Sequence, residues 1–352
     1  MINLDDADAL RAADPRGMLD AVAGLPGHCR EGYAAGRDAH DLPSADGLTA
    51  MTFCGMGGSA VAGDVLRVLY RERLRVPVEV VRGPSLPAYC GPQTLVLCSS
   101  YSGNTAETLS CFEEAVKRGC RNVCITSGGE LRLRAGEEGA AIVPIPPGFQ
   151  PRAALGYLAP GALGALESVG LLPGMEDELA QAAAELSLLA ARLGPANPRP
   201  DNEAKELAVM IRDRTPVIWG ADGRGSVAAM RWKTQMNENA KRPAFWSALP
   251  ELDHNEVVGW AGRSGAPYFL IVLRHEGENP DVAARFPASI QIAEEAGMVV
   301  EEVWAAGRAP LGQLLTLVMM GDFTSVYLAL DRGVDPSPVE VIDRLKRALE
   351  ES

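Results

Sequence analysis

The chain has 352 residues, of which 47% are hydrophobic and 22% charged, and this length suits two globular domains that each bury a core. The 46 acidic side chains outnumber the 33 basic ones. The resulting net charge of -13 disfavours nucleic acid and anionic membranes as partners of the whole surface, so an anionic ligand would need a locally positive pocket.

The seven cysteines form no CxxC pair and no zinc-ligand spacing, and most lie in apolar runs such as residues 52–54. We interpret them as reduced core residues of a cytoplasmic protein. The opening sequence MINLDDADAL has neither a basic segment nor a continuous apolar stretch, so no signal peptide is expected. The apolar region 153–171 is interrupted by Pro160, by glycines and by Glu167, which makes it a poor membrane span.

The first half of the chain alternates short β-rich runs with helical patterns, which indicates parallel strands joined by helical crossovers. The predicted strands are 51–54, 78–81, 95–98, 123–126 and 142–145. Helical periodicity then covers 157–193, with a break near 170–174. The proline-rich segment 195–200 is the best candidate for a junction, so we predict an N-terminal domain over 1–194 and a C-terminal domain over 201–352.

The same pattern restarts beyond the junction. Its predicted parts are a strand at 217–219, a glycine turn at 220–225, a helix to about Asn239, a strand at 268–273, a helix over 281–296, a strand at 298–304, and long helices at about 310–332 and 337–350. This echo predicts an α/β fold made of two flavodoxin-like, doubly wound parallel-sheet domains in tandem. Ligands of such sheets bind outside the carboxyl ends of the strands.

A glycine-rich loop, Gly55-Met56-Gly57-Gly58-Ser59-Ala60, follows the first predicted strand and opens a helix. Its N–H groups and the positive helix end suit an anion. The loop also satisfies a relaxed dinucleotide fingerprint, and Glu79 at the end of the second strand could serve as the ribose-binding acid. A nicotinamide-dependent oxidoreductase is therefore an alternative on this loop alone.

A second loop, Ser99-Ser100-Tyr101-Ser102-Gly103-Asn104-Thr105, brings several hydroxyls to another helix start at the same edge of the predicted sheet. Hydroxyl and N–H groups suit a terminal phosphate, and the lack of a GxxxxGK[ST] motif disfavours ATP and GTP. The alternative is that these side chains only cap the helix. The two loops together favour a phosphate site over either alternative.

With these loops the sequence resembles the SIS (sugar isomerase) fold and, more narrowly, the bifunctional phosphoglucose/phosphomannose isomerase family. The narrower resemblance is carried by Phe149–Tyr157 (FQPRAALGY), Asn237–Lys241 (NENAK), Leu249–Glu256 (LPELDHNE) and Gly333–Val339 (GVDPSPV). It implies interconversion of glucose 6-phosphate and mannose 6-phosphate with fructose 6-phosphate through an enediolate, without a cofactor. It also implies that the substrate phosphate is held by Gly57, Gly58, Ser59, Ser100, Ser102 and Thr105.

Aldose–ketose isomerisation needs a base, a cation near the developing oxyanion and a proton shuttle that opens the sugar ring. The resemblance implies that Glu238 is the base, and we expect it at the same strand edge as the glycine turn 220–225. It implies that Arg152 lies beside the enediolate, where a fixed guanidinium suits the task. The alternative for Arg152 is an interdomain salt bridge.

His254 is the only one of the four histidines within a dense polar cluster, and histidine is the side chain best suited to proton transfer near neutral pH. The resemblance implies that it reaches the site from the partner subunit of a homodimer. Lys346 is implied to assist ring opening, and a solvated helix face is its alternative. Ser337 stands where the family usually has threonine, which leaves the balance between the two epimers open.

A noncatalytic sugar-phosphate sensor is the alternative function. It would need the phosphate loops but not Glu238, Arg152 and His254 together, and no DNA-binding helix-turn-helix precedes residue 50. No cluster with zinc-ligand spacing accompanies the candidate residues, so the sequence predicts no metal requirement.

Overall fold

The computed structural model describes residues 2–262 and 265–350, and the chain forms two compact units that are each discontinuous in sequence. The N-terminal unit comprises Gly24–Leu188 and Ala306–Thr316. The C-terminal unit comprises the residues up to Ala23, Leu189–Ala305 and the residues from Leu317 onward. The sequence predicted continuous domains on either side of 195–200, and that assignment of domains stays a prediction.

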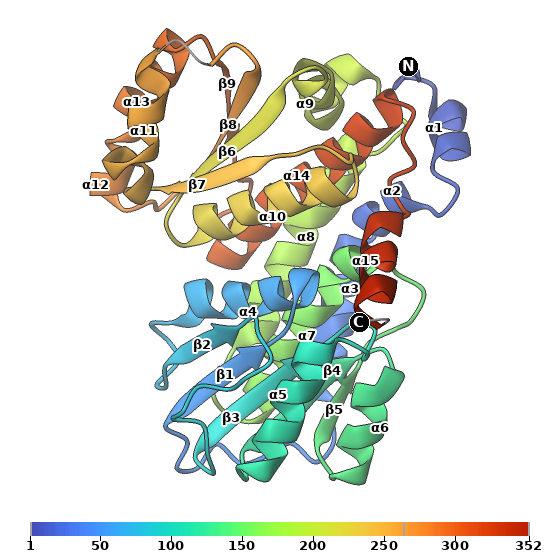
Figure 1. Cartoon of the computed structure of the whole chain (residues 1–352), viewed down its shortest axis with the longest axis vertical. Coiled ribbons are helices and arrows are strands. Elements are labelled where there is room, and N and C mark those ends of the chain that lie inside the picture. Colours follow the sequence, from blue (N-terminus) through green and yellow to red (C-terminus); the bar gives the residue numbers. More distant parts are fainter. Residues whose placement is uncertain (1, 263–264, 351–352) are drawn as a thin grey trace. The chain divides into compact units, whose positions relative to one another are not determined.

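The N-terminal unit is built on one parallel sheet with the strand order β2-β1-β3-β4-β5 (Figure 1). Its strands are β1 (Ala50–Cys54), β2 (Val78–Val81), β3 (Thr94–Ser99), β4 (Arg121–Thr126) and β5 (Ala141–Pro144). Every residue of β1 and β3 is buried, as expected for central strands that are covered on both faces. This is the flavodoxin-like order, so the predicted α/β doubly wound class is confirmed.

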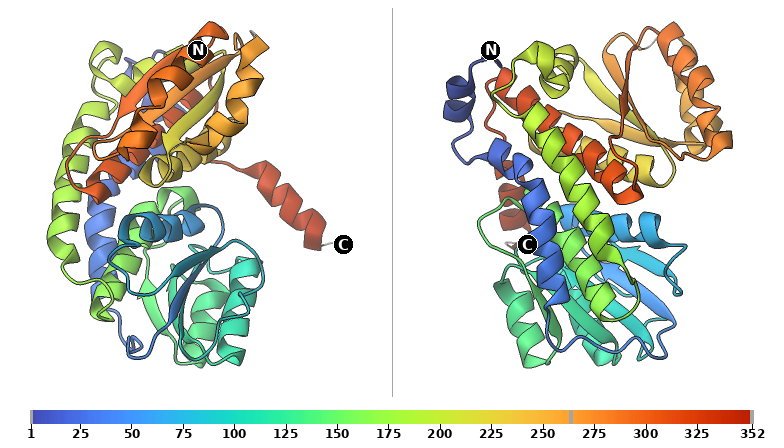
Figure 2. Two further views of the ribbon diagram at one scale, coloured as in Figure 1. Left: turned by 90° about the vertical axis from the view of Figure 1, so that its left-hand side faces the viewer. Right: turned by 180° about the vertical axis from the view of Figure 1, so that it is seen from behind.

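Helices cover both faces of this sheet (Figure 2). They are α3 (Leu25–Arg37), α4 (Gly57–Tyr70), α5 (Ala106–Lys117), α6 (Gly129–Glu137), the 3-10 turn η1 (Pro151–Ala153), α7 (Leu155–Ser168) and most of α8 (Met175–Leu193). Helices α5 and α6 pack on one face, and α3, α4 and α7 lie on the other. The helical break predicted near 170–174 separates α7 from α8.

Helices α3 and α7 pack backbone to backbone through glycines. A Cβ atom added to Gly36 would lie 2.0 Å from the carbonyl oxygen of Gly161, and one added to Gly164 would lie 2.2 Å from that of Tyr33. The apolar region 153–171 therefore forms a buried helix whose glycines admit a neighbouring helix.

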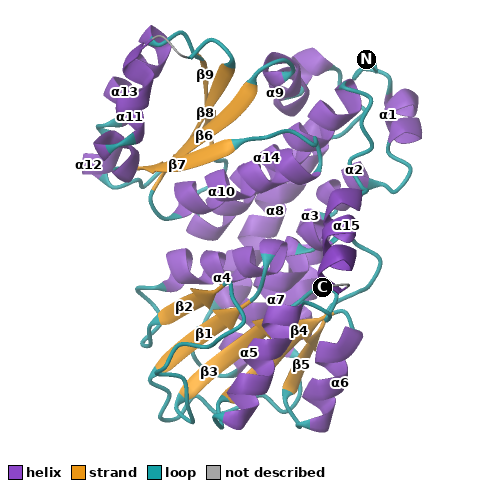
Figure 3. Cartoon of the chain, viewed as in Figure 1, coloured by secondary structure: helices purple, strands orange, loops and turns teal. Residues whose placement is uncertain are grey.

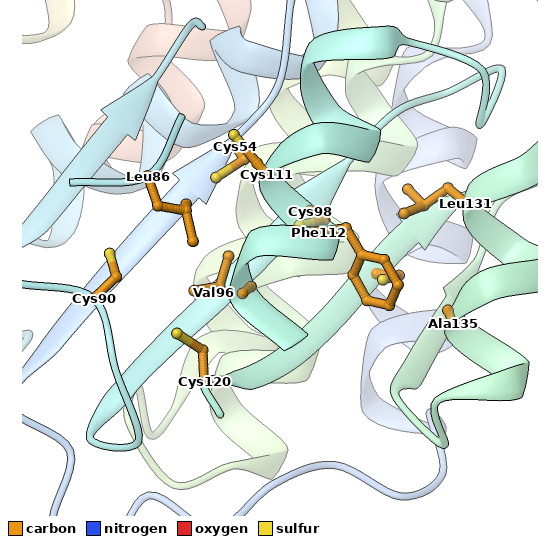
Figure 4. Packing of buried hydrophobic residues seen from close by; sticks show 12 residues of the cluster. Cys54, Leu86, Cys90, Val96, Cys98, Cys111, Phe112, Cys120, Leu131 and Ala135 are labelled. Atoms are coloured by element: carbon orange, nitrogen blue, oxygen red, sulfur yellow. The ribbon is translucent and has the colours of Figure 1, made fainter. Parts of the chain in front are cut away.

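The seven cysteines are free and buried, as predicted. Six of them gather in one core cluster between the sheet and helices α5 and α6, where Phe112 is the largest side chain (Figure 4). Burial raises the pKa of the Cys120 thiol to about 11 and that of Cys124 to about 12. These thiols are therefore neutral near pH 7 and pack as small apolar side chains.

The C-terminal unit repeats the architecture with four parallel strands in the order β7-β6-β8-β9. They are β6 (Thr215–Ala221), β7 (Phe245–Leu249), β8 (Tyr268–Arg274) and β9 (Val299–Trp304). Strand β7 was not predicted, because it is an edge strand whose Phe245 and Trp246 side chains are exposed. The order matches that of the first four strands in the N-terminal unit, so the predicted internal repeat is confirmed.

Figure 3 shows the helices of the C-terminal unit in purple. They are α1 (Ala7–Ala13), α2 (Met18–Ala23), η2 (Arg199–Asp201), α9 (Glu203–Ile211), α10 (Arg224–Glu238), η3 (Glu251–His254), α11 (Glu256–Gly259), η4 (Trp260–Gly262), α12 (Pro280–Ala283), α13 (Phe286–Glu295), α14 (Pro310–Asp331) and α15 (Glu340–Glu350). The division between the two units falls within α8 and α14.

Helix α14 is the one helix of the described residues that is long and apolar enough to cross a membrane. Its apolar window is entirely buried within the protein. Such burial is typical of the core helix of a soluble protein.

Candidate active site

The two predicted phosphate loops meet at the topological switch point of the N-terminal sheet. Strand β1 leads to β2 on one side, whereas its neighbour β3 leads to β4 on the other. Loop 55–60 follows the carboxyl end of β1 and loop 99–105 follows that of β3. This crevice is where open α/β sheets bind their ligands.

The glycine loop is shaped for close approach to its neighbours. Gly57 has a φ of 52°, in the left-handed region that glycine adopts without a steric penalty. A Cβ atom on Gly58 would lie 3.1 Å from the carbonyl oxygen of Pro151 and 3.4 Å from Cα of Arg152. Helix α4 begins here without a side-chain cap, so its positive end faces the loop.

The serine loop holds its hydroxyls in a small network. The Oγ atom of Ser100 lies 2.9 Å from Oγ1 of Thr105 and accepts a hydrogen bond from the Gly103 N–H at 3.1 Å. Thr105 is the N-cap residue of α5, but its side chain makes no capping bond. Ser102 is exposed, and its Oγ accepts from the Asn104 N–H at 3.3 Å. The alternative that the Thr105 side chain only caps α5 therefore does not hold.

Arg152 lies in η1 and is 2% exposed. The close approach of its Cα to Gly58 brings it to the same end of the sheet as the phosphate loops. The structure thus gathers Arg152 and all six predicted phosphate residues in one unit. A guanidinium that is always charged supplies positive charge to this end of an otherwise acidic protein.

Glu238 does not lie at the strand edge that carries the glycine turn, and that prediction was wrong. Glu238 ends α10, which starts just after the carboxyl end of β6 and runs back for 15 residues, or about 22 Å. The chain then enters β7 at Phe245, which pairs with Val217 near the start of β6. A crossover helix runs antiparallel to its strands, so Glu238 lies at the edge formed by their amino ends.

A cavity of about 710 Å³ borders Glu238. It is lined by Asn237, Glu238, Lys241, Arg242, Pro243, Val334, Asp335, Pro338, Val339, Glu340, Val341 and Ile342. Helix α15 begins at this cavity and carries Lys346, whose side chain lies outside the described residues. The structure therefore brings Glu238 to the base of α15.

Lys241 is a residue near Glu238 that the sequence reasoning missed. Its φ is 54°, and its ammonium group donates to the backbone carbonyls of Glu238 and Pro336. A cation at a helix C-terminus interacts favourably with the helix dipole. The signal was a lysine just past the end of a predicted helix, within the Asn237–Lys241 stretch.

His254 is exposed and ends η3, directly after the carboxyl end of β7. It therefore lies at the opposite edge of the C-terminal sheet from Glu238. These two residues do not meet within the C-terminal unit of one chain.

Ser337 is buried, and its N–H donates to Oδ1 of Asp335 at 2.8 Å in the segment that lines the cavity.

The dinucleotide alternative lacks its acidic residue. Glu79 pairs with Thr52 in the middle of β1, and its carboxylate accepts a hydrogen bond from the Tyr89 hydroxyl at 3.0 Å. A ribose-binding acid must reach the crevice at the carboxyl ends of the strands, which Glu79 does not. The register of β2 therefore disfavours a nicotinamide cofactor on this loop.

The arrangement of acidic, histidine and cysteine side chains also bears on metal binding. Within residues 2–262 and 265–350, no three or more His, Cys, Asp or Glu side chains are grouped so that they could hold a metal ion.

A doubly wound sheet with these loops at its switch point, followed by a second sheet with the same strand order, is typical of the class of SIS-domain proteins. Residues 200–349 match the family model for the bacterial phospho-glucose isomerase C-terminal SIS domain. Over 98% of its length the chain also superposes on 94% of a solved hypothetical protein from Thermus thermophilus, with a TM-score of 0.75 and 18% identity, a likeness of fold.

Two curated relatives are each named bifunctional phosphoglucose/phosphomannose isomerase. The one from Caldicellulosiruptor bescii is 36% identical over 95% of this chain and 99% of its own length. The one from Aquifex aeolicus is 38% identical over 88% of this chain and 92% of its own. The chain belongs to the bifunctional phosphoglucose/phosphomannose isomerase family.

Proposed function

We propose that this chain interconverts glucose 6-phosphate and mannose 6-phosphate with fructose 6-phosphate by proton transfer between C1 and C2. The observation that carries the proposal is the match, over nearly the whole chain, to relatives named for this activity. By family, the chain is an isomerase. Arg152 also supports this reaction. It is buried beside Gly58, so its positive charge lies at the candidate binding site for the substrate phosphate.

In this proposal the loops at 55–60 and 99–105 hold the phosphate, and Glu238 moves the proton. The carboxylate removes the proton from C2 of the aldose and delivers a proton to C1, while the hydroxyl proton moves from O2 to O1 and the carbonyl moves from C1 to C2. Arg152 stabilises the negative charge that develops on the enediolate oxygens. Because C2 becomes planar in the enediolate, glucose 6-phosphate and mannose 6-phosphate share one intermediate. These steps use side chains alone, so we propose that the reaction needs no metal.

In the proposed homodimer, His254 reaches the site from the partner subunit. This histidine opens the sugar ring. Two observations support this arrangement: His254 is exposed, and Glu238 of the same chain lies at the other edge of the C-terminal sheet. Lys346 would assist ring opening. We further propose that the enzyme works in the cytoplasm, where its free thiols stay reduced.

Turnover by metal-depleted enzyme tests this function. The purified protein is treated with a chelator and incubated separately with each aldose phosphate, and fructose 6-phosphate is quantified. We expect both aldoses to be converted by wild type and neither by Glu238→Gln, because a general base contributes roughly 10²–10⁴ in rate. Glu295→Gln is the matched control, since Glu295 also ends a helix of the same unit and is exposed.

Three outcomes contradict parts of the proposal. Binding without turnover would favour a sugar-phosphate sensor. Activity that a chelator removes and a metal restores would refute metal independence. Near-normal turnover by Glu238→Gln would refute the assignment of the base.

A further inference from the structure

Tyr101 links the two phosphate loops to each other and to the loops that follow β4 and β5. It lies in the serine loop and is 6% exposed. Its N–H donates to Oγ of Ser59 in the glycine loop at 3.3 Å. Its carbonyl oxygen accepts from the N–H of Ser127 at 3.0 Å and from the Ser127 hydroxyl at 2.6 Å. The backbone of Tyr101 is therefore fixed against the loops that follow β1 and β4.

The Tyr101 hydroxyl reaches a third loop, the one that leads from β5 into η1. It donates to the carbonyl oxygen of Pro146 at 2.9 Å and accepts from the N–H of Phe149 at 2.8 Å. Burial raises the pKa of Tyr101, so the hydroxyl keeps the proton that it donates. One phenol group therefore holds both ends of the 146–149 segment.

The side chain of Phe149 fixes the same segment from its other side. Its ring lies 4.9 Å from the His28 ring and 5.4 Å from the Tyr157 ring, measured between centroids. With its backbone held by Tyr101 and its ring held by these neighbours, Phe149 has little freedom to move. Arg152 follows three residues later, in the turn that lies against Gly58.

We propose that Tyr101 is a positioning residue that holds Arg152 in register with the phosphate site. This inference rests on the role proposed above for Arg152. Tyr101 bonds to the backbone of the segment that delivers Arg152, so its hydroxyl acts through the guanidinium. Arg152 is proposed to act on charge that develops in the transition state, so its displacement lowers kcat more than it weakens phosphate binding.

Tyr101→Phe tests the proposal because it removes only the hydroxyl. Tyr70→Phe is the matched control: Tyr70 is 1% exposed in the same unit, and its hydroxyl donates to Glu178 at 3.1 Å. We expect Tyr101→Phe to lower kcat by about tenfold to a hundredfold, since small misplacements of catalytic groups have effects of this size. KM for glucose 6-phosphate should change by less than about threefold. Tyr70→Phe should retain wild-type kcat.

The melting temperature of each variant separates positioning from stability. If both variants lose similar stability but only Tyr101→Phe loses kcat, the effect is specific to the site. A Tyr101→Phe enzyme with wild-type kcat would overturn the proposal. So would equal losses of kcat in the two variants, or a tenfold rise in KM at unchanged kcat.

A double-mutant cycle with Arg152→Lys tests whether Tyr101 acts through Arg152. If it does, adding Tyr101→Phe to Arg152→Lys costs much less in kcat than Tyr101→Phe costs alone, because coupled residues are not additive. Additive losses would overturn the proposal. Wild-type turnover by Arg152→Lys would refute the role proposed for Arg152, and this inference with it. If Arg152→Lys loses kcat while Tyr101→Phe keeps the wild-type kcat, this inference is refuted but the role proposed for Arg152 is not.

Discussion

His28 is a buried histidine whose ring stacks on Tyr157 at 4.6 Å, and its burial lowers its pKa below the ordinary value of 6.5. Below about pH 6.5 the unfolded chain therefore binds more protons at this site than the folded chain does. Stability present above pH 6.5 is lost as the pH falls, because the free energy of unfolding drops wherever the unfolded state takes up more protons. We predict that the melting temperature falls as the pH is lowered from 7.5 to 5.

His28→Phe should make this fall smaller, because phenylalanine fills a similar place without titrating. Part of the fall should persist, since burial also lowers the pKa of His275. His40→Gln, which replaces an exposed histidine, is the matched control. An identical pH dependence in wild type and His28→Phe would contradict the prediction.

That the two candidate phosphate loops meet at one sheet edge was predictable from sequence, whereas the position of Glu238 was not predicted correctly. Residues 57–59 and 100–105 follow neighbouring parallel strands, and parallel strands bring their carboxyl ends to one edge. Glu238 follows a whole helix, so its position depends on the direction of α10 across the sheet. The expected edge was wrong because a helix that starts at the carboxyl ends of the strands runs back toward their amino ends. Tyr101 was also missed, because its partners at 146–149 are distant in sequence.

Helices α3 and α7 give the clearest prediction at the level of secondary-structure elements. Gly36→Ala would put a methyl group 2.0 Å from a backbone oxygen of α7, and backbone cannot yield as a flexible side chain can. We expect a loss of about 1–3 kcal/mol or more in the free energy of unfolding. Gly27→Ala is the control in the same helix, because nothing lies within 4 Å of its added Cβ. Denaturant unfolding of both variants checks this, and equal stability of the two would refute backbone-to-backbone packing.

The strands of the N-terminal sheet were predicted to within two residues because they are short apolar runs bounded by turn residues. Strand β7 was missed since Phe245 and Trp246 are exposed at a sheet edge, which removes the pattern of a buried strand. The single helix predicted over 281–296 is two helices, and Pro287 stands in the first turn of the second. Local patterns thus revealed buried elements better than edges and breaks, which depend on tertiary surroundings.

At the scale of the whole molecule, the central question is how a complete site forms when Glu238 and His254 lie at opposite edges of one sheet. The proposed homodimer answers it by pairing Glu238 of one chain with His254 of the other. Equal amounts of Glu238→Gln and His254→Asn should then restore activity when the two inactive proteins are unfolded and refolded together. Half of the randomly formed dimers are mixed and have one intact site of two, so about a quarter of wild-type activity is expected.

The same mixture distinguishes the arrangements of the site. If both residues of a site came from one chain, no mixed dimer would contain an intact site and the mixture would stay inactive. The activity of each variant, unfolded and refolded alone, provides the baseline. Size-exclusion chromatography with light scattering gives the mass of the refolded species, and an active monomer would refute the partner-subunit arrangement.

The measurement that tests the central claim most directly is isomerisation in D₂O, followed by NMR. Fructose 6-phosphate is incubated with the enzyme, and deuterium at C2 of the aldose products is quantified. If Glu238 moves the proton through an enediolate, solvent deuterium should enter C2 of both glucose 6-phosphate and mannose 6-phosphate, and Glu238→Gln should produce neither. Products that form at the wild-type rate in the variant, or a single epimer in the wild-type reaction, would contradict the account.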